Sequence, residues 1–372
     1  MINVLHFYKT YYPDTFGGVE QVIYQLSEKG PTNNINANVL SLSRDHITSK
    51  QTIGNHLSWK VKLNFEIASS PFSISALSKF KELSRQADII HYHFPWPFMD
   101  LVDFISNVDR PKIVSYHSDI IRQKNLLRLY RPLMHNFLSK VDRIIATSPN
   151  YFESSDVLQQ YQKKVDIIPI GIDPNTYPSI PADVADGWRQ KLGERYFLFI
   201  GKLRYYKGLH FLIEAAKNAP YPIVIAGSGP EEEQLKKQAI ANRATNIYFL
   251  GELSEVDKMA VLRGCYSLVF PSHLRSEAFG ISLLEAAMEA KPLISCEIGT
   301  GTTYINKDKS TGIVIPPEDP QAIRNAMDTL WYSPELAQTY GKNALLRFEE
   351  MFTADKMAER YASVYQELVK MA

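Results

Sequence analysis

The chain has 372 residues, of which 45% are hydrophobic, 12% aromatic and 22% charged. It can therefore bury a core that offsets the entropy of ordering, which excludes a disordered protein, a peptide hormone and a small disulfide scaffold. The 41 lysines and arginines against 40 acidic residues leave a net charge of +1, which gives no sign of nucleic-acid binding.

The chain starts with an apolar run of only a few residues, which predicts a first strand and not a secretory signal. No run approaches the roughly 18 apolar residues that span a bilayer. Cys265 and Cys296 are too few for a disulfide framework and are expected to be buried in a reducing compartment. We therefore expect a cytoplasmic protein, with peripheral attachment to the inner face of the plasma membrane left open.

Short β-rich runs alternate with amphipathic helical stretches along the chain, which is the pattern of parallel sheets covered by helices in the α/β class. The first half predicts strands at 2–7, 36–42, 88–93, 112–117, 142–148 and 164–170. The second half predicts strands at 196–201, 221–227, 246–251, 266–272, 292–296 and 312–316. The tail from Pro334 to Ala372 is predicted to be almost wholly helical.

A dense group of prolines after Pro169 predicts a linker over 171–195. Strands resume directly after it, so residues 1–170 and 196–352 are each expected to form a Rossmann-like, doubly wound domain, the two facing a cleft. Ligands bind such sheets at the carboxyl ends of the strands. The last helix, at about 353–372, is predicted to cross back to the first domain.

Gly17 and Gly18 follow the first strand and precede a helix predicted to start at about Val19. A glycine turn at a helix N-terminus presents backbone amides to an anion and lets a ligand approach closely, although a plain tight turn fits as well. Neither glycine-rich stretch, at 227–232 or 299–304, completes the GxGxxG fingerprint of nicotinamide-binding proteins.

Three cations, Lys202, Arg204 and Lys207, lie between a predicted strand and the helix that follows it. Cations at a helix N-terminus oppose the helix dipole, so their gathering there indicates a bound anion, and a diphosphate fits best. A solvated basic loop is the alternative.

Two carboxylates, Glu277 and Glu285, flank the predicted start of a helix near Gly280. This spacing places Glu277 in the preceding loop and Glu285 two turns along the helix, so that they address different parts of one extended ligand. The first amides, those of Gly280, Ile281 and Ser282, are free to meet a phosphate. Carboxylates accept hydrogen bonds from paired sugar hydroxyls, although exposed helix glutamates are also common.

The motifs occur in a characteristic order: the glycine pair, His117 in SYHSD at a strand end, GKLRYYKG, AGSGPE and EAFGISLLE. Over nearly the whole chain this order resembles the nucleotide-sugar-dependent retaining glycosyltransferases of family 4, which have the GT-B fold. The residues YYPDTFGGVEQ, LRYYKG and EIGTGTTYIN further resemble bacterial mannosyl- or D-rhamnosyltransferases of O-polysaccharide assembly.

The resemblance implies a role for each donor-side residue. Glu285 would bind the ribose hydroxyls, and Glu277 would hold the transferred hexose with the backbone of Phe279 and Gly280, beside Ile281. Arg204 and Lys207 would clamp the diphosphate, with Gly17 and Gly18 approaching it from the other domain. Because the family often has arginine at the position of Lys202, either Lys202 or Arg204 is the second cation, and the planar fork of Arg204 favours it.

On the acceptor side, the resemblance gives His117 a catalytic role at the donor sugar and the incoming hydroxyl. By itself, a histidine at a strand end is more often structural. His91 and His93 share a predicted strand face at a spacing that can ligate a metal, but no nearby carboxylates support this. The sequence also lacks Asp-x-Asp, the usual device for a divalent ion on a nucleotide diphosphate. No metal and no cofactor are therefore expected.

The family implies front-face substitution with retention, from a GDP-sugar in preference to a UDP-sugar, onto a lipid-linked oligosaccharide for bacterial surface polysaccharide. Two alternatives share the donor pocket: a GT-B nucleotide-sugar epimerase and a non-catalytic sugar-nucleotide-binding subunit. The stretch 122–140 holds five basic and no acidic residues among leucines and aromatics. It indicates either a helix lying on anionic lipid or a core helix with a solvated basic face.

Overall fold

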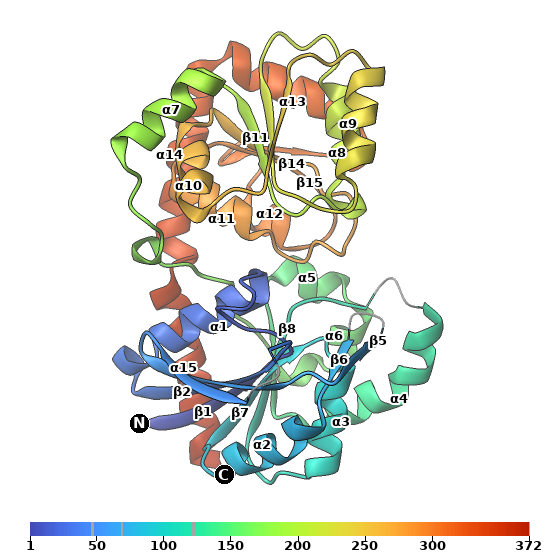
Figure 1. Cartoon of the computed structure of the whole chain (residues 1–372), viewed down its shortest axis with the longest axis vertical. Coiled ribbons are helices and arrows are strands. Elements are labelled where there is room, and N and C mark those ends of the chain that lie inside the picture. Colours follow the sequence, from blue (N-terminus) through green and yellow to red (C-terminus); the bar gives the residue numbers. More distant parts are fainter. Residues whose placement is uncertain (46–47, 68–69, 121–123, 372) are drawn as a thin grey trace. The chain divides into compact units, whose positions relative to one another are not determined.

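The computed structural model describes residues 1–45, 48–67, 70–120 and 124–371 (Figure 1). They form two compact units. Unit 1 consists of Met1–Gly171 together with Ala354–Ala372, and unit 2 of Ile172–Thr353.

Unit 1 is built on an eight-stranded sheet with the strand order β10-β9-β8-β7-β1-β2-β4-β3. All neighbours are parallel except β3 and β4. The strands are β1 (Ile2–Phe7), β2 (Ile35–Ser43), β3 (Ser49–Ile53), β4 (His56–Lys62), β7 (Ile89–Phe94), β8 (Lys112–Tyr116), β9 (Arg143–Ala146) and β10 (Val165–Ile167). A separate antiparallel ribbon pairs β5 (Phe65–Ile67) with β6 (Ser70–Phe72).

Helices cover this sheet and bury its central strands along their length, as in β7, where all six residues, two histidines among them, are buried. They are α1 (Gly18–Glu28), α2 (Ile74–Ser84), α3 (Pro97–Ser106), α4 (Lys124–Lys140), α5 (Pro149–Ser154), α6 (Asp156–Gln160) and α15 (Ala354–Met371), with short 3₁₀ turns η1 (Pro31–Asn33) and η2 (Gln162–Lys164). The last helix, α15, packs against α1 and β7, and an ion pair joins Lys29 of the α1 C-cap to Asp355 at 2.9 Å.

Unit 2 has a six-stranded, fully parallel sheet in the order β13-β12-β11-β14-β15-β16. Its strands are β11 (Phe197–Ile200), β12 (Ile223–Ala226), β13 (Ile247–Gly251), β14 (Ser267–Phe270), β15 (Leu293–Cys296) and β16 (Gly312–Ile315). Its helices are α7 (Ala182–Leu192), α8 (Leu209–Ala215), α9 (Glu232–Ala241), α10 (Glu255–Gly264), α11 (Ile281–Met288), α12 (Gly301–Ile305), α13 (Pro320–Tyr332) and α14 (Pro334–Met351), with 3₁₀ turns η3 (Pro174–Thr176) and η4 (Tyr205–Lys207).

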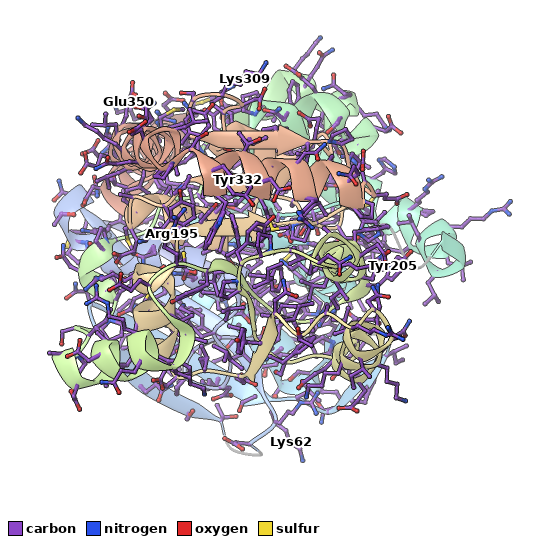
Figure 2. All side chains as sticks on the ribbon, turned by 90° about the horizontal axis from the view of Figure 1, so that it is seen from above. Lys62, Arg195, Tyr205, Lys309, Tyr332 and Glu350 are labelled. Atoms are coloured by element: carbon purple, nitrogen blue, oxygen red, sulfur yellow. The ribbon has the colours of Figure 1, made fainter. Side chains whose placement is uncertain are left out.

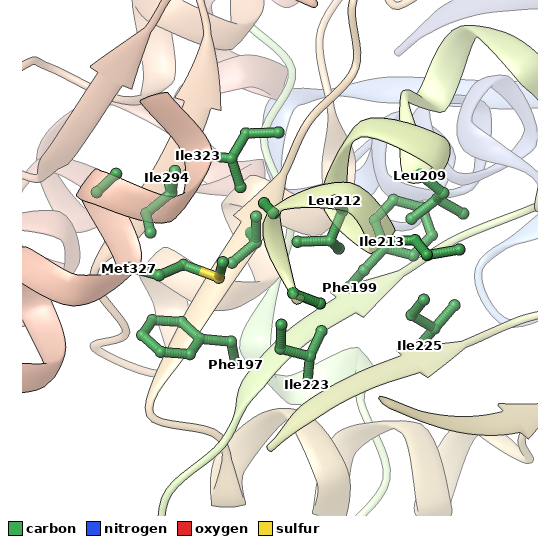
Figure 3. Packing of buried hydrophobic residues seen from close by; sticks show 14 of the residues in the cluster. Phe197, Phe199, Leu209, Leu212, Ile213, Ile223, Ile225, Ile294, Ile323 and Met327 are labelled. Atoms are coloured by element: carbon green, nitrogen blue, oxygen red, sulfur yellow. The ribbon is translucent and has the colours of Figure 1, made fainter. Parts of the chain in front are cut away.

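Apolar side chains from the sheet, α8 and α13 form a hydrophobic core of unit 2, and Figure 3 shows Phe197, Leu212, Ile294 and Met327 packed within it. Each of these four side chains is fully buried. Their burial supplies the main driving force that holds the helices on the parallel sheet.

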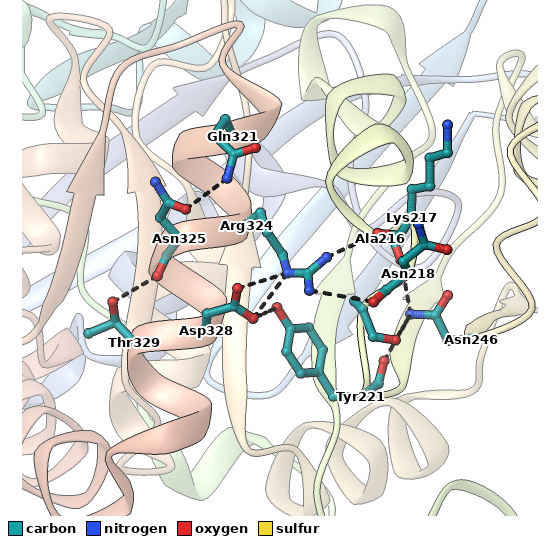
Figure 4. Close-up of polar contacts among 11 residues, drawn as sticks. Ala216, Lys217, Asn218, Tyr221, Asn246, Gln321, Arg324, Asn325, Asp328 and Thr329 are labelled. Carbon is teal, nitrogen blue, oxygen red and sulfur yellow. Dashed lines mark hydrogen bonds and ion pairs between the residues drawn. The ribbon is translucent and has the colours of Figure 1, made fainter.

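A polar clamp fixes the turn between α8 and β12 to α13 (Figure 4). Arg324 pairs with Asp328 and donates to the carbonyl of Lys217 at 3.0 Å, while the hydroxyl of Tyr221 donates to Asp328 at 2.7 Å. Asn246 donates to the carbonyl of Tyr221 at 3.0 Å. These bonds give hydrogen-bond partners to carbonyls of the irregular turn that follows α8.

Two segments differ from the sequence prediction. Residues 171–195, predicted as a linker, belong mostly to unit 2 and contain α7, because the prolines end at Pro181, which serves as the N-cap of that helix. The strands β3 and β4 were not predicted. β3, at the sheet edge, is mostly polar, whereas β4 alternates polar with apolar residues, a strand signal that was overlooked. The predicted α/β class and doubly wound parallel sheets are confirmed.

The two cysteines are buried and unpaired, as predicted. Among the described residues, no helix is both long enough and apolar enough to cross a bilayer.

Gly208 connects the turn after β11 to α8 and lies against the segment that follows β14. Its φ is +69°, and a Cβ at this position would lie 2.0 Å from the carbonyl oxygen of Pro271. Only glycine fits such a conformation and such a close backbone approach.

We therefore expect Gly208→Ala to lower the free energy of unfolding by at least about 1–3 kcal/mol, because it adds a backbone clash to left-handed strain. Gly187→Ala is the matched control, since a Cβ at Gly187 in α7 meets nothing within 4 Å and should raise stability slightly. Thermal or urea denaturation measures both. A Gly208→Ala protein as stable as the wild type would contradict the packing described.

Candidate active site

The candidate donor-side residues of unit 2 follow two strands that lie next to each other. The segment 201–208 follows β11, the segment 271–280 follows β14, and these strands pair in parallel. Their carboxyl ends therefore lie at the same edge of the sheet. Ser282 ties the second segment to the first strand, since its hydroxyl donates to the carbonyl of Ile200 at 3.1 Å.

Lys207 and Glu277 form a buried ion pair at this edge. The ammonium group of Lys207 contacts Oε2 of Glu277, and each residue is only 8% exposed. The hydroxyl of Ser272 donates to the same oxygen at 3.1 Å, and the ammonium lies 4.7 Å from the ring centroid of Phe270. An ammonium has three donors and the carboxylate a second oxygen, so both groups retain capacity for a ligand.

The other two cations of this loop differ in their partners. Lys202 is exposed and pairs with Glu252 at 3.2 Å. Arg204 is exposed, and among the described residues its guanidinium has no ion pair or hydrogen bond. Its neighbour Tyr205 is 49% exposed and lies at the surface in Figure 2. Of the two, Arg204 is the cation that remains available for an anion.

The glycines at 227 and 229 bring another backbone segment against this loop. A Cβ on Gly227 would lie 2.0 Å from the carbonyl oxygen of Gly201, and one on Gly229 would lie 2.4 Å from that of Leu203. These glycines therefore serve backbone packing that shapes the cationic loop.

Helix α11 starts at the position that the sequence predicts. Gly280, at φ +102°, is the N-cap, and the amides of the first turn, which includes Ile281, have no partner within the helix. Phe279, just before the cap, is 4% exposed and leaves no room for a Cβ on Gly301, which would lie 2.4 Å from its ring. The buried ring thus fixes the backbone ahead of the helix.

Glu285 lies on the buried side of α11 and is 4% exposed. Its Oε1 accepts from the hydroxyl of Tyr177 and from the ammonium of Lys258, both at 3.0 Å. Burial opposes the charge of Lys258, but Glu285 and Glu255 outweigh it and raise the pKa of Lys258 above its ordinary value. Tyr177 and Lys258 were not predicted, because nothing in their local pattern indicates a partner so far along the chain.

In unit 1, His117 directly follows β8, and its backbone amide donates to the carbonyl of Phe94 at 3.0 Å. It is 8% exposed, and burial lowers its pKa to about 3, so the ring is neutral at cellular pH. Its Nε2 lies 3.1 Å from Nδ1 of His93. A neutral imidazole offers a ligand one donor or one acceptor, but no charge.

Gly17 is the N-cap of α1, and Gly18 is its first residue; both are exposed. A Cβ on Gly17 would lie 2.8 Å from the carboxylate of Glu20, which accepts hydrogen bonds from Thr10 at 2.7 Å and Thr15 at 2.9 Å. Glu20 was not predicted as part of the site. Its negative charge in the first turn already complements the helix dipole.

His91 and His93 share a strand face, as predicted, and their rings stack with centroids 4.4 Å apart. The structure adds His6 of β1, so that one nitrogen from each of the three buried rings lies within 4.8 Å of the others. His6 could not be joined to the pair from sequence, because the contact depends on the strand order.

The basic stretch 122–140 forms α4 from Lys124, and Arg122 lies outside the described residues. The C-terminal half of the helix packs inward through Phe137, which is 1% exposed and lies edge-on to Tyr92. In the N-terminal half Leu126 and Leu129 are 49% and 81% exposed. One helix thus combines a core-facing half and an exposed half.

Comparison with known proteins identifies the family. The family described as "Glycosyltransferase Family 4" matches residues 16–176, and "Glycosyl transferases group 1" matches 185–347. The chain is 52% identical over 353 residues to the D-rhamnosyltransferase WbpZ of Pseudomonas aeruginosa, covering 95% of this chain and 93% of the other. It is 49% identical over 369 residues to the O-antigen chain mannosyltransferase C of Escherichia coli, covering 99% of each.

Solved structures agree on the fold. The sucrose-phosphate synthase of Thermosynechococcus elongatus aligns with a TM-score of 0.82 at 18% identity, over the full length of both chains. The Anabaena protein HepE, in complex with UDP and glucose, aligns with a TM-score of 0.76 at 18% identity, over 99% of this chain and all of the other. The resemblance found in the sequence is thereby confirmed, and the chain belongs to the family 4 glycosyltransferases with the GT-B fold.

Proposed function

We propose that the protein is a retaining hexosyltransferase that moves mannose or D-rhamnose from a GDP-sugar to a lipid-linked glycan in bacterial O-antigen synthesis. The names of the two relatives, which share about half of their residues with this chain, support the sugar and the pathway. The observation that carries the chemistry is the buried Lys207–Glu277 pair, which joins the loop after β11 to the loop that leads into the helix of Glu285.

In this proposal the donor lies along the strand edge of unit 2. Glu285 binds the ribose hydroxyls through the carboxylate oxygen that Tyr177 and Lys258 leave free. Lys207 and Arg204 hold the diphosphate, and the first amides of α11 contact the same group. Glu277 holds the hexose, beside the backbone of Phe279 and Gly280.

Unit 1 supplies the acceptor-side residues. His117 contacts the sugar and the incoming hydroxyl as a neutral ring, in keeping with its lowered pKa. Gly17 and Gly18 allow the phosphates to approach the backbone, while Glu20 disfavours a full anion directly on the end of α1.

The proposed reaction is a front-face substitution. The bond between the anomeric carbon and the phosphate oxygen breaks, the acceptor oxygen bonds to the same face of that carbon, and the acceptor proton passes to the departing phosphate. Charge on the diphosphate grows as the bond breaks, and Lys207 and Arg204 stabilise it in the transition state. This assigns to side chains the role that a divalent ion plays elsewhere, and the sequence has no Asp-x-Asp to hold one.

A donor panel tests the proposal. GDP-mannose and GDP-D-rhamnose should raise the melting temperature more than UDP-sugars do, because a ligand that binds only the folded state stabilises it. Transfer should require a glycan acceptor analogue. Donor consumption without acceptor would favour an epimerase, and donor binding without any turnover would favour a non-catalytic subunit.

Glu285→Gln should weaken donor binding by about 1.5–3 kcal/mol, because a hydrogen bond to a charged group is lost while side-chain volume is kept. Calorimetry with the GDP-sugar measures it. Glu289→Gln, just beyond the end of the same helix, is the control, since Glu289 forms an ion pair with Arg263 instead. Equal donor affinity in both variants would show that Glu285 does not bind the donor.

Lys207→Ala should remove about 3–4 kcal/mol of transition-state stabilisation and so lower kcat. The factor by which kcat falls should exceed the factor by which the apparent KM for the donor rises. Lys202→Ala, which loses only an exposed cation, should keep turnover close to the wild type. Melting temperatures check that Glu277, left without its partner, does not unfold the variant. Normal turnover of Lys207→Ala would contradict the proposed clamp.

Activity should persist in excess EDTA, because the leaving group is stabilised by cationic side chains. The assay compares initial rates before and after chelation and after Mg²⁺ is added back. A rate that collapses with EDTA and returns with Mg²⁺ would show that a metal, and not the pair Lys207 and Arg204, stabilises the leaving group.

We further propose that the exposed half of α4 lies on anionic lipid. Leu126 and Leu129 are exposed beside the exposed cations Arg128 and Arg131, which is the composition of an interfacial helix. Because a lipid-linked acceptor is anchored in the membrane, the enzyme would meet it at that surface.

The double variant Arg128→Gln with Arg131→Gln should weaken binding to vesicles that contain phosphatidylglycerol by about 1 kcal/mol per cation. Transfer to a water-soluble acceptor analogue should be unchanged. Lys62→Gln with Arg85→Gln, two exposed cations of unit 1 outside α4, is the control pair. Equal loss of vesicle binding in both double variants would indicate general charge and not this helix.

A further inference from the structure

Three histidines from three adjacent strands of unit 1 form a hydrogen-bonded row. Nδ1 of His6, on β1, lies 3.1 Å from Nε2 of His93, on β7. Nδ1 of His93 in turn lies 3.1 Å from Nε2 of His117, which follows β8. The strand order β8-β7-β1 places the three residues side by side on one face of the sheet.

The rings are held inside the protein and uncharged. His6 is 1% exposed, His93 is fully buried and His117 is 8% exposed. Burial lowers the pKa of His6 and of His117 to about 3, and that of His93 well below its usual range, with neighbouring histidines adding to the effect at His93. At cellular pH each ring therefore carries a single N–H.

The two contacts restrict which tautomers the three rings can adopt together. If the proton of His93 is on Nδ1, it donates to Nε2 of His117, which must then carry its own proton on Nδ1. Nε2 of His93 then accepts from Nδ1–H of His6. If the proton of His93 is on Nε2, both contacts reverse and all three protons are on Nε2. Satisfying both contacts thus requires the same tautomer in all three rings.

The outer nitrogen of the row faces away from these contacts. Among the described residues, Nδ1 of His117 has no hydrogen-bond partner. It is also not one of the polar atoms that those residues bury without a partner. Whether this nitrogen donates or accepts decides which atom of a sugar or hydroxyl it can meet. That choice is coupled through the two contacts to the tautomers of His93 and His6 inside the protein.

We propose that His93 and His6 are positioning residues that act as an imidazole relay and fix the tautomer of His117. The proposal rests on the role of His117 in the proposed function, and it adds two residues that touch no substrate. They are comparable to the outer partner that fixes the tautomer of a ligating or catalytic histidine.

A buried metal would be the competing explanation, since His6, His91 and His93 can each direct one nitrogen to a common point. The nitrogens are engaged, however. His91 contacts the hydroxyl of Tyr365 at 2.7 Å and that of Ser115 at 2.8 Å, and both nitrogens of His93 contact other histidines. A metal would have to break these bonds, whereas the relay uses them.

The test observes the tautomers directly by nitrogen NMR of the full-length protein labelled in histidine. In the wild type, the signals of His6, His93 and His117 should report one common tautomer. His93→Phe keeps the ring shape but removes both contacts, so the signal of His117 should become a mixture of tautomers. Its kcat should fall about 10- to 100-fold, as when an outer partner of a functional histidine is lost, with little change in KM for the donor.

A matched pair of variants at His6 guards against a folding defect. His6→Asn gives Nε2 of His93 an amide partner that can either donate or accept, so the His117 signal should become a mixture of tautomers while the variant should keep the melting temperature of the wild type. His6→Leu leaves Nε2 of His93 without a partner and should lower the melting temperature. His91→Gln, beside the row but outside it, should lower the melting temperature through its bonds to α15 and leave the His117 signal unchanged.

Three results would overturn the relay: opposite tautomers of His93 and His117, a His117 signal unaffected by His93→Phe, or one equivalent of tightly bound zinc in the purified wild type. If the tautomers follow the prediction but kcat does not change, the relay stands and the catalytic role of His117 fails. The two proposals are therefore tested separately.

Discussion

The site depends on one constraint, which is that the strands of each sheet run in parallel almost throughout. Parallel pairing gathers the carboxyl ends of the strands at one edge, so that loops distant in sequence meet there. In unit 2 this brings Lys207 and Glu277, separated by 70 residues, into contact after β11 and β14. In unit 1 it aligns His6, His93 and His117 across three strands. A different strand order in either sheet would separate the side chains that meet at its edge.

Burial of the Lys207–Glu277 pair adds a second level of organisation. Taking both charges out of water costs several kcal/mol per ion, and only close pairing with further hydrogen bonds offsets that cost. Ser272 and the ring of Phe270 complete the surroundings. The pair therefore holds two loops in a fixed relation before any donor arrives, which lowers the cost of ordering them during binding.

Much of the fold was predictable from the sequence because buried parallel strands read as continuous apolar runs between helices. All twelve predicted strands correspond to strands of the two sheets, whereas the mostly polar edge strand β3 and its neighbour β4 were missed. Within the candidate site, motif order predicted Glu277, Gly280 and Lys207, and the structure places Lys207 and Glu277 in contact and Gly280 at the N-cap of α11. Tyr177, Lys258 and His6 were not predicted, because a residue whose partner is brought to it by tertiary packing has no local sequence signature.

The return of α15 to unit 1 has a consequence for how the protein is made. Unit 2 is one continuous segment, Ile172–Thr353, whereas unit 1 lacks the helix α15 until the segment that follows unit 2 has been synthesised. Domains fold as units during translation, usually in the order in which they emerge. In this chain the later unit can finish first, and the sheet face around His91 waits for Tyr361 and Tyr365, the last contacts to reach it. The histidine side of unit 1 is thus completed only after the whole of unit 2 has been synthesised.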